Sequence, residues 1–243
     1  MDVKYTIRYL HHSSFTIETL NHLLIFDYFH DVPPKGKERN IENGVVTREL
    51  LKTDKDILVF VTHSHSDHYN PVIFQWEQIN PNITYILSSD IKVEKPKKNY
   101  YFLDKYEGLE VNGLVIEAFG STDQGVSFYI EVEGLSIFHS GDLNWWHWKE
   151  FSKEKQLQEE VDFKNELKYL SDKNIDISFV PVDPRLEEYY YLAGKYFAEN
   201  IKPKLMVPMH FGDHFEITNR IAEKLETLPV KVPTIHRRGQ VIR

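Results

Sequence analysis

The chain has 243 residues, and its 29 Lys and Arg against 37 Asp and Glu give a formal net charge of −8. This excess of acid argues against a protein whose main task is to neutralise nucleic-acid phosphates, and a hydrophobic content of 41% excludes a disordered or low-complexity chain. The sequence contains no cysteine, which excludes disulfides, thiolate nucleophiles and Cys-ligated zinc and leaves histidine and carboxylate as the strong metal ligands.

Residues 1–8 are charged and alternating, and no apolar run approaches the roughly 18 residues that cross a membrane. We therefore expect a cytoplasmic protein without membrane contact. The sequence has no repeat at a fixed period and no shift in composition that would mark a linker, so one domain over residues 1–243 is the simpler interpretation.

The first third of the chain predicts short strands and two short helices. Three alternating runs predict a meander of strands at residues 4–9, 15–19 and 23–26. Thr47 can cap a short helix to Leu51. The apolar run at residues 57–61 predicts a strand buried on both faces, and Asn70-Pro71 predicts the start of a helix that reaches about residue 79.

The remainder predicts further strands and three helices. Strands are expected at residues 83–87, 114–118, 126–132, 135–138, 175–180 and 205–208, with hairpin signals at Asn112-Gly113 and Glu133-Gly134. Helices are expected within residues 145–170, 189–200 and 217–228, and Leu157, Val161 and Leu167 are expected to face inward. Hairpins combined with helices that interrupt and follow the strands predict an α/β fold of layered sheets covered by helices.

The segment Thr62–His68 carries the strongest chemical signal. Residues two apart on a strand point the same way, so His63 and His65 are expected to project together from the end of the buried strand. Asp67 and His68 follow on the turn before the next helix. Three imidazoles and one carboxylate are ligands that Zn²⁺, Fe and Mn accept, and four such fixed positions match by chance in on the order of one sequence in a thousand. The alternative is a His-rich loop without a metal.

This segment resembles the His-x-His-x-Asp-His signature of the metallo-β-lactamase superfamily. Phe138–Asp142 is similar to the family's Gly-Asp at a strand end, and Val207–Phe211 is similar to the stretch with its C-terminal ligand histidine, His210. The resemblance covers nearly the whole chain. It implies a four-layer αββα sandwich and a centre that holds one or two Zn²⁺ ions, with Mn²⁺ or Fe as alternatives.

The resemblance also implies a role for each ligand. His63 and His65 would bind the first metal, Asp67, His68 and His210 would bind the second, and Asp142 would bridge the two. The family places a further first-site histidine in a Gly-His-Thr stretch, and the matching residues here are Gly120-Ser121-Thr122. Ser121 stands at the position of that histidine. Asp123 is either a replacement ligand or a turn residue at the Gly125 bend.

Several residues near these motifs are candidates for the pocket. Leu10–Phe15 resembles the N-terminal Gly-His-Ser-Ser motif of the branch of the family that includes ascorbate-6-phosphate lactonase. By this match His12 lies near the metals; the alternative is an ordinary histidine in a turn. Asp27 matches an early aspartate that orients ligand loops. His214 is a pocket-rim candidate, four residues after His210.

Two aromatic residues and one arginine are substrate-binding candidates. Trp145 and Trp146 follow Asp142 directly, where they form a substrate wall or anchor the next helix. Arg185 binds an anionic group or pairs with Asp183 or Glu187.

The resemblance implies a metal-dependent hydrolase that directs a metal-activated water at a small, anionic ester, lactone or phosphodiester. Asp67 would belong to the catalytic site, and His12 or His214 would protonate the leaving group. The expected partner is therefore a small-molecule substrate. The alternatives are a nuclease of the same fold, against which the net charge of −8 argues, and a non-catalytic metal-binding module. Hydrolysis of phosphodiester and lactone probes separates the catalytic interpretations from the non-catalytic one.

Overall fold

The computed structural model describes residues 4–242, which fall into two compact units. The first unit comprises Met1–Leu103 and Ile235–Arg243, and the second comprises Asp104–Thr234. Each unit is one β-sheet with helices, so the α/β character predicted from the sequence is present in both. A single domain over residues 1–243 stays a prediction, and residues 1–3 and Arg243 lie outside the described range.

The first unit is built on a seven-stranded sheet in the order β13-β1-β2-β3-β4-β5-β6. Its strands are β1 (Thr6–His11), β2 (Ser14–Glu18), β3 (His22–Phe26), β4 (Asp56–Val61), β5 (Thr84–Ser88), β6 (Tyr100–Leu103) and β13 (Val241–Ile242). The first three strands form the predicted antiparallel meander, and β3 to β6 are parallel. Because the carboxyl ends of parallel strands meet at one edge of a sheet, the loops after β3 and β4 lie at the same edge.

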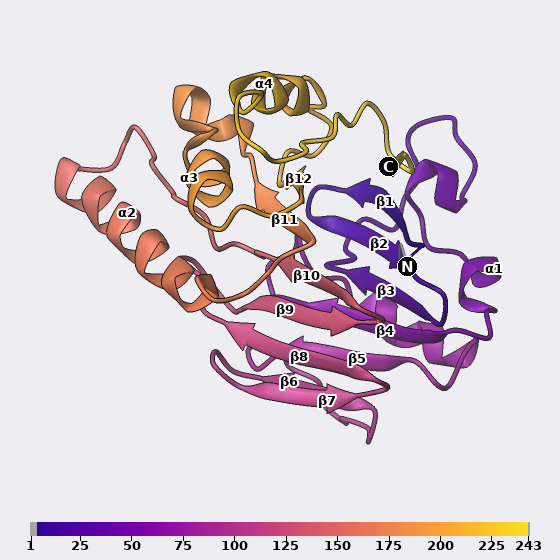
Figure 1. Ribbon diagram of the computed structural model, residues 1–243. Coiled ribbons are helices and arrows are strands. Elements are labelled where there is room, and N and C mark those ends of the chain that lie inside the picture. The colour runs from indigo at the N-terminus through magenta and orange to yellow at the C-terminus, as the bar shows by residue number, and fades with distance from the viewer. Residues whose placement is uncertain (1–3, 243) are drawn as a thin grey trace. The chain divides into compact units, whose positions relative to one another are not determined.

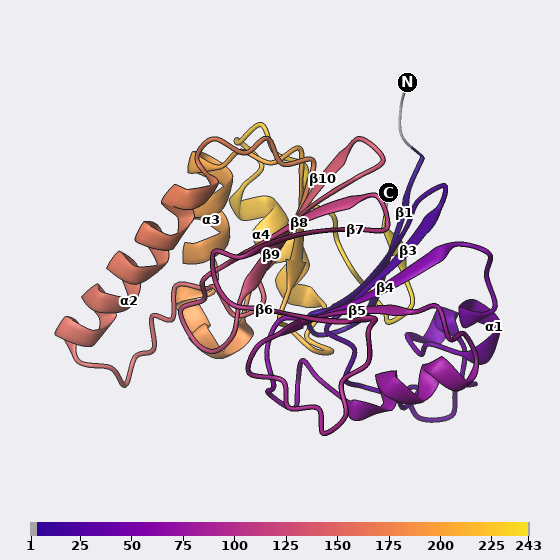
Figure 2. The same cartoon turned by 90° about the horizontal axis from the view of Figure 1, so that it is seen from below.

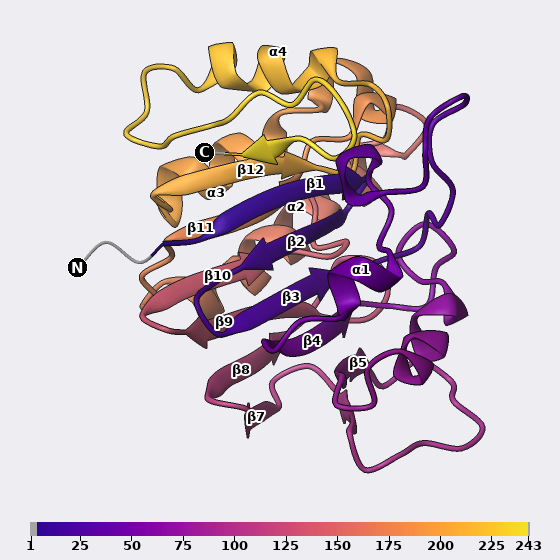
Figure 3. The same ribbon diagram turned by 90° about the vertical axis from the view of Figure 1, so that its right-hand side faces the viewer.

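Short helices cover one face of this sheet (Figures 2 and 3). They are η1 (Ile41–Asn43), α1 (Arg48–Leu51) and η2 (Pro71–Gln78). Leu51 and Trp76 are buried in a core with strand residues such as Val59 and Tyr85. The side chain of Asn70 accepts a hydrogen bond from the Val72 amide, so the predicted cap is confirmed, although η2 is a 3₁₀ helix.

The second unit is built on a six-stranded sheet in the order β12-β11-β10-β9-β8-β7 (Figure 1). Its strands are β7 (Gly108–Val111), β8 (Leu114–Phe119), β9 (Ser127–Val132), β10 (Leu135–His139), β11 (Ile177–Pro181) and β12 (Leu205–Met209). Both predicted hairpins are confirmed, because Asn112-Gly113 and Glu133-Gly134 each have two consecutive positive φ angles, as a type I′ turn requires. Strands β10, β11 and β12 are parallel.

The helices of the second unit lie on one face of its sheet (Figures 1 and 2). They are α2 (Lys153–Leu167), η3 (Lys168–Leu170), η4 (Pro184–Tyr189), α3 (Leu192–Asn200) and α4 (Glu216–Lys224). Helix α3 packs on the sheet through Phe197, whose ring lies 5.6 Å from that of Phe138 in β10. Within residues 4–242, no helix has both the length and the apolar character needed to cross a membrane.

The structure corrects two predictions about α2. Residues 145–152 are not helical, and the helix begins at Lys153 after Ser152, whose side chain accepts a hydrogen bond from the Lys155 amide. Leu157 and Val161 do not face inward: they are 60% and 42% exposed. Leu167 is buried as predicted, together with Glu159 and Phe163. Glu159 and Phe163 each lie two residues after Leu157 and Val161, and hence on the opposite side of the helix.

Candidate metal centre

In the first unit, the predicted histidine clamp forms at the end of β4. His63 and His68 are fully buried, and the centroid of the His63 ring lies 4.1 Å from that of His68 and 4.6 Å from that of His65. One ligand atom each of His63 and His68 lie within 4.8 Å of one another. The sequence spacing therefore brings these imidazoles together as expected.

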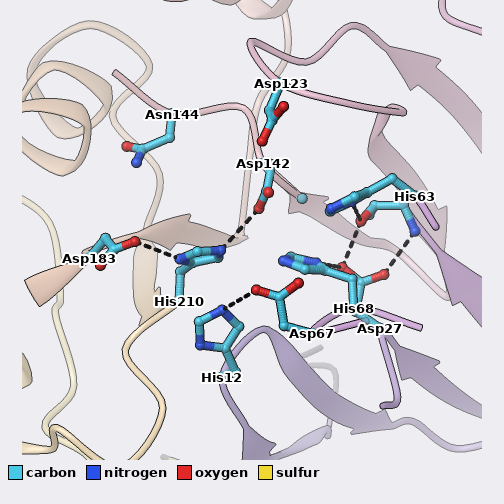
Figure 4. Close-up of polar contacts among 12 residues, drawn as sticks. His12, Asp27, His63, Asp67, His68, Asp123, Asp142, Asn144, Asp183 and His210 are labelled. Carbon is cyan, nitrogen blue, oxygen red and sulfur yellow. Dashed lines mark hydrogen bonds and ion pairs between the residues drawn. The ribbon is translucent and has the colours of Figure 1, made fainter. Parts of the chain in front are cut away.

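Asp27, at the end of β3, organises this clamp through three hydrogen bonds (Figure 4). Its carboxylate accepts from the Thr62 amide at 2.8 Å, from the Thr62 hydroxyl at 2.7 Å and from His68 Nδ1 at 2.7 Å. Because the Thr62 hydroxyl donates to Asp27, its oxygen is left to accept from His63 Nδ1, 3.0 Å away. One buried carboxylate thus sets the tautomer of both rings and leaves Nε2 of each as a ligand atom. These hydrogen bonds agree with the orienting role predicted for Asp27, which stays a prediction.

His12 lies beside the clamp at the turn after β1. Its φ angle of 56° is in the left-handed region, and its amide donates to the Tyr9 hydroxyl. Its Nε2 atom lies 3.6 Å from Asp67 Oδ2, and the side chains of His12, Asp67 and His68 each offer one ligand atom within 4.8 Å of the others. The structure therefore brings His12 into the group of donors in the first unit.

In the second unit, two carboxylates flank His210 (Figure 4). His210 follows β12 with a φ of 66°, and its Nδ1 lies 3.0 Å from Asp183 Oδ2 while its Nε2 lies 3.2 Å from Asp142 Oδ1. All three side chains are 5% exposed or less. Since a carboxylate only accepts hydrogen bonds, His210 donates from Nδ1 to Asp183 and directs Nε2 at Asp142.

Arg185 holds Asp183 from the other side. Its Nε and Nη2 groups donate to both carboxylate oxygens of Asp183. Burial raises the pKa of Asp183, but the hydrogen bonds from His210 and Arg185 outweigh it and lower this pKa to about 2. The ion pair with Asp183, one of the two alternatives for Arg185, is therefore present, and its guanidinium also lies over the ring of Trp148.

Trp146 packs against both Asp142 and His210. Its indole N–H donates to the Asp142 carbonyl at 3.2 Å, its ring meets the His210 ring edge to face, and it stacks on Trp148 with a centroid distance of 5.8 Å. Trp145 points elsewhere: its ring packs against Phe163 of α2 and Tyr196 of α3. A substrate contact for either indole stays a prediction.

The segment matched to the family's Gly-His-Thr stretch lies against the turn that carries Asp142. Thr122 donates from its hydroxyl to the Asn144 carbonyl at 2.6 Å and accepts from the Asn144 amide at 2.9 Å. Asp123 is exposed, and one of its carboxylate oxygens lies within 4.8 Å of one of Asp142. His214 lies outside these groups, 68% exposed and paired with Glu216 at 3.6 Å.

The donors present fit a divalent transition metal. His63, His68 and His210 are each held at Nδ1 by an oxygen, which is the arrangement that prepares Nε2 for a metal. His210 Nε2 and Asp142 Oδ1 are 3.2 Å apart. Two ligands bound at about 2.0–2.2 Å with a tetrahedral angle between them are separated by roughly 3.3 Å, so the observed distance suits a shared ion.

Asp27 apart, the residues that orient the ligands are those that sequence reasoning missed. Thr62 and Thr122 received no role, and Asp183 was considered only as a partner of Arg185. Three site residues, His12, Asp27 and His210, have positive φ angles at strand ends. Such conformations are uncommon for residues other than glycine and cluster at functional sites, and no residue pattern in the sequence predicts them.

Fold and donor set together define a metallo-hydrolase type of protein, and comparison with known proteins identifies the family. A family model described as the beta-lactamase superfamily domain matches residues 6–210, so the chain belongs to this family. UPF0173 metal-dependent hydrolase SERP1270 of Staphylococcus epidermidis is 23% identical over 203 residues, covering 73% of this chain and 79% of that protein. A UPF0173 metal-dependent hydrolase of Thermococcus onnurineus is 22% identical over 244 residues, covering 93% and 96%.

The solved structure of Igni18, described as a novel metallo hydrolase from Ignicoccus hospitalis, superposes with a TM-score of 0.64 at 16% identity, covering 98% of this chain and 97% of that one. The family match and this likeness together confirm the predicted α/β fold of the metallo-β-lactamase type. The prediction of a metal-dependent hydrolase is confirmed, because the relatives that match this chain are described as metal-dependent hydrolases.

Proposed function

We propose that this chain is a metal-dependent hydrolase that acts on a small, anionic ester, lactone or phosphodiester. The observation that carries the proposal is the fixing of three imidazoles at Nδ1, two by the Asp27 network and one by Asp183. Buried, oriented imidazoles next to buried carboxylates are costly to build unless they hold a cation. The lactonase-like branch and a cytoplasmic location belong to the same proposal.

The proposed ligands are those of the family. His63 and His65 would hold the first ion, Asp67, His68 and His210 would hold the second, and Asp142 would be shared between them; zinc is the proposed metal. The order of the motifs along the chain and the geometry within each unit support this assignment. A bound divalent metal lowers the pKa of water towards neutrality and polarises the oxygen of the substrate.

The chain's own residues supply the proton. His12 is oriented towards Asp67, with Nε2 3.6 Å from Oδ2, and its side chain is 13% exposed. We assign it the protonation of the leaving group, with Asp67 holding the ring in place. His214 is the alternative donor from the second unit, where its exposure allows exchange of protons with solvent.

Asp123 is the proposed replacement for the histidine that the family places at Ser121. The proximity of its carboxylate to that of Asp142 supports this role. A site with an oxygen ligand in place of a nitrogen ligand binds zinc less tightly, so the two sites are expected to fill unequally. Titration with zinc should give one tight and one weaker equivalent, and Asp123→Ala should lose the weaker one; two equally tight equivalents that survive Asp123→Ala would refute this role.

Arg185 is the proposed anchor for the substrate's negative group, with Trp146 and Trp145 as candidate walls. The Arg185 side chain is 56% exposed although its guanidinium is paired with Asp183. A preorganised guanidinium offers a fixed fork of donors, which suits a carboxylate or phosphate.

The function is tested with protein loaded with zinc or manganese and a panel of phosphodiester, lactone and carboxylic ester probes. We expect turnover on at least one anionic probe, abolished by His68→Ala and retained by His236→Ala, an exposed histidine outside both groups of donors. Activity that survives His68→Ala, or a fully loaded protein that turns over none of these probes, would contradict the proposal.

A further inference from the structure

Glu166 connects helix α2 to the loop at residues 120–125 of the second unit. Glu166, in the last turn of α2, accepts a hydrogen bond from the Gly120 amide at 2.6 Å with Oε1 and one from the Tyr106 hydroxyl at 2.9 Å with Oε2. Gly120 directly follows β8 and is buried. Figure 1 shows this end of α2 beside the end of β8.

Gly120 is fixed on both sides of its peptide backbone. Besides the bond from its amide to Glu166, its carbonyl accepts from the Ser127 hydroxyl at 3.1 Å. A Cβ atom on residue 120 would lie 2.7 Å from the Glu166 carboxyl group, closer than such atoms approach. A side chain at residue 120 would therefore displace the Glu166 carboxyl group, which is the far end of a flexible side chain.

Thr122, two residues after Gly120 in the same loop, is hydrogen-bonded to the turn that carries Asp142. The Thr122 hydroxyl exchanges hydrogen bonds with the carbonyl and the amide of Asn144, and it also lies 3.2 Å from the Asp142 carbonyl. Thr122 is hence the link between the loop at residues 120–125 and the backbone of a proposed metal ligand.

We infer that Glu166 is a positioning residue for the metal centre, which acts through the Gly120 backbone and the Thr122 hydroxyl on the turn that carries Asp142. This inference rests on the proposed function, because it assigns Asp142 and Asp123 to the metal. Partners that orient metal ligands, when removed, typically cost about 10–100-fold in metal affinity. Removal of a helix carboxylate that only stabilised α2 would leave that affinity unchanged.

Four single variants test the chain of hydrogen bonds from Glu166 through Gly120 and Thr122. Glu166→Ala removes the acceptor, and Glu166→Gln keeps an acceptor oxygen for the Gly120 amide. Gly120→Ala displaces the Glu166 carboxyl group while leaving that residue in place. Asp162→Ala is the matched control, an exposed carboxylate on the same helix whose bond is to Gln158 four residues away.

The first readout is zinc affinity in competition with a chelator. We expect Glu166→Ala and Gly120→Ala each to weaken binding about 10–100-fold, and Glu166→Gln and Asp162→Ala to bind within about threefold of the wild type. The double variant Glu166→Ala/Gly120→Ala should bind no more weakly than Glu166→Ala, since both substitutions break the same contact.

The second readout is amide hydrogen exchange in metal-free protein, at residues 120–125 and at Asn144. Glu166→Ala should accelerate exchange there about tenfold or more, while the amides of the β10 and β11 strands keep their wild-type rates. Wild-type protein that takes up no zinc would refute the proposed function. Wild-type zinc uptake combined with unchanged affinity and exchange in Glu166→Ala would overturn the role of Glu166 alone.

Discussion

Removal of the Asp27 carboxylate is the perturbation whose size the structure fixes best. Asp27 is fully buried, and it accepts hydrogen bonds from the Thr62 amide, the Thr62 hydroxyl and His68 Nδ1, all at 2.7–2.8 Å. In Asp27→Ala these three donors lose their acceptor in a space that solvent does not reach. The substitution therefore adds a desolvation cost to the loss of the bonds themselves.

A buried hydrogen bond to a charged group contributes about 1.5–3 kcal/mol, and breaking a buried charged network by removing one member costs about 3–5 kcal/mol. We expect Asp27→Ala to lower the free energy of unfolding by about 3–5 kcal/mol, a large share of the 5–15 kcal/mol typical of a domain. Asp27→Asn keeps one acceptor oxygen but opposes the other donors with its own amide, so its loss should be roughly half as large.

Urea unfolding in excess chelator measures this loss without any contribution from bound metal. The matched control is Asp56→Ala, an aspartate of the neighbouring strand that is 57% exposed and should change stability by less than about 0.5 kcal/mol. Zinc affinity of the folded Asp27→Asn protein should fall about 10–100-fold, because the tautomers of His63 and His68 are then no longer held. A loss for Asp27→Ala no larger than that for Asp56→Ala would refute the reasoning.

Three further results are expected. Phe163→Ala should cost about 3–5 kcal/mol in urea unfolding whereas Leu157→Ser, on the exposed face of α2, should stay within about 0.5 kcal/mol; equal losses would contradict the observed helix face. Burial raises the pKa of Asp176, but hydrogen bonds from Lys204 and Ser136 outweigh it and lower this pKa below 3.8. The ionised carboxylate of Asp176 stabilises the fold above the ordinary pKa of 3.8, and this contribution is lost as the pH falls through the lowered pKa. The unfolding free energies of the wild type and Asp176→Asn should therefore differ at pH 7 and converge in acid. A difference that stays constant with pH would count against the ion pair. Arg185→Met should raise KM for an anionic probe about tenfold relative to a neutral one, with Arg185→Lys intermediate, and equal KM changes for both probes would remove Arg185 from substrate binding.

The elements that the sequence predicts well are those with strong local signals. The buried strand β4 depends on a continuous apolar run, the meander depends on alternation, and the two hairpins depend on the turn signals Asn-Gly and Glu-Gly. Helix α2 is different, because apolar residues occur on both of its faces. Only packing decides that Phe163 is buried and Val161 is exposed. The strands β6 and β7 are short edge strands, and no prediction included them.

The candidate site likewise combines contacts that the sequence predicts locally with contacts that depend on the fold. His63, His65, Asp67 and His68 lie within six residues, so local spacing alone predicts their meeting. His210 and its partner Asp183 are 27 residues apart, and Thr62 meets Asp27 across 35 residues, so these contacts depend on which strands become neighbours. The left-handed backbone of His210 is likewise set by the end of β12 rather than by residue type.

The most direct test of the account is the metal content of the purified protein after exposure to Zn²⁺, Mn²⁺ or Fe²⁺ and removal of unbound ions. We predict that the wild type retains a transition metal in proportion to protein and that the combined variant Asp142→Ala/His210→Ala loses most of it. Wild-type protein that retains no such ion, under conditions in which its fold is intact by circular dichroism, would contradict the claim that these imidazoles and carboxylates exist to hold a metal.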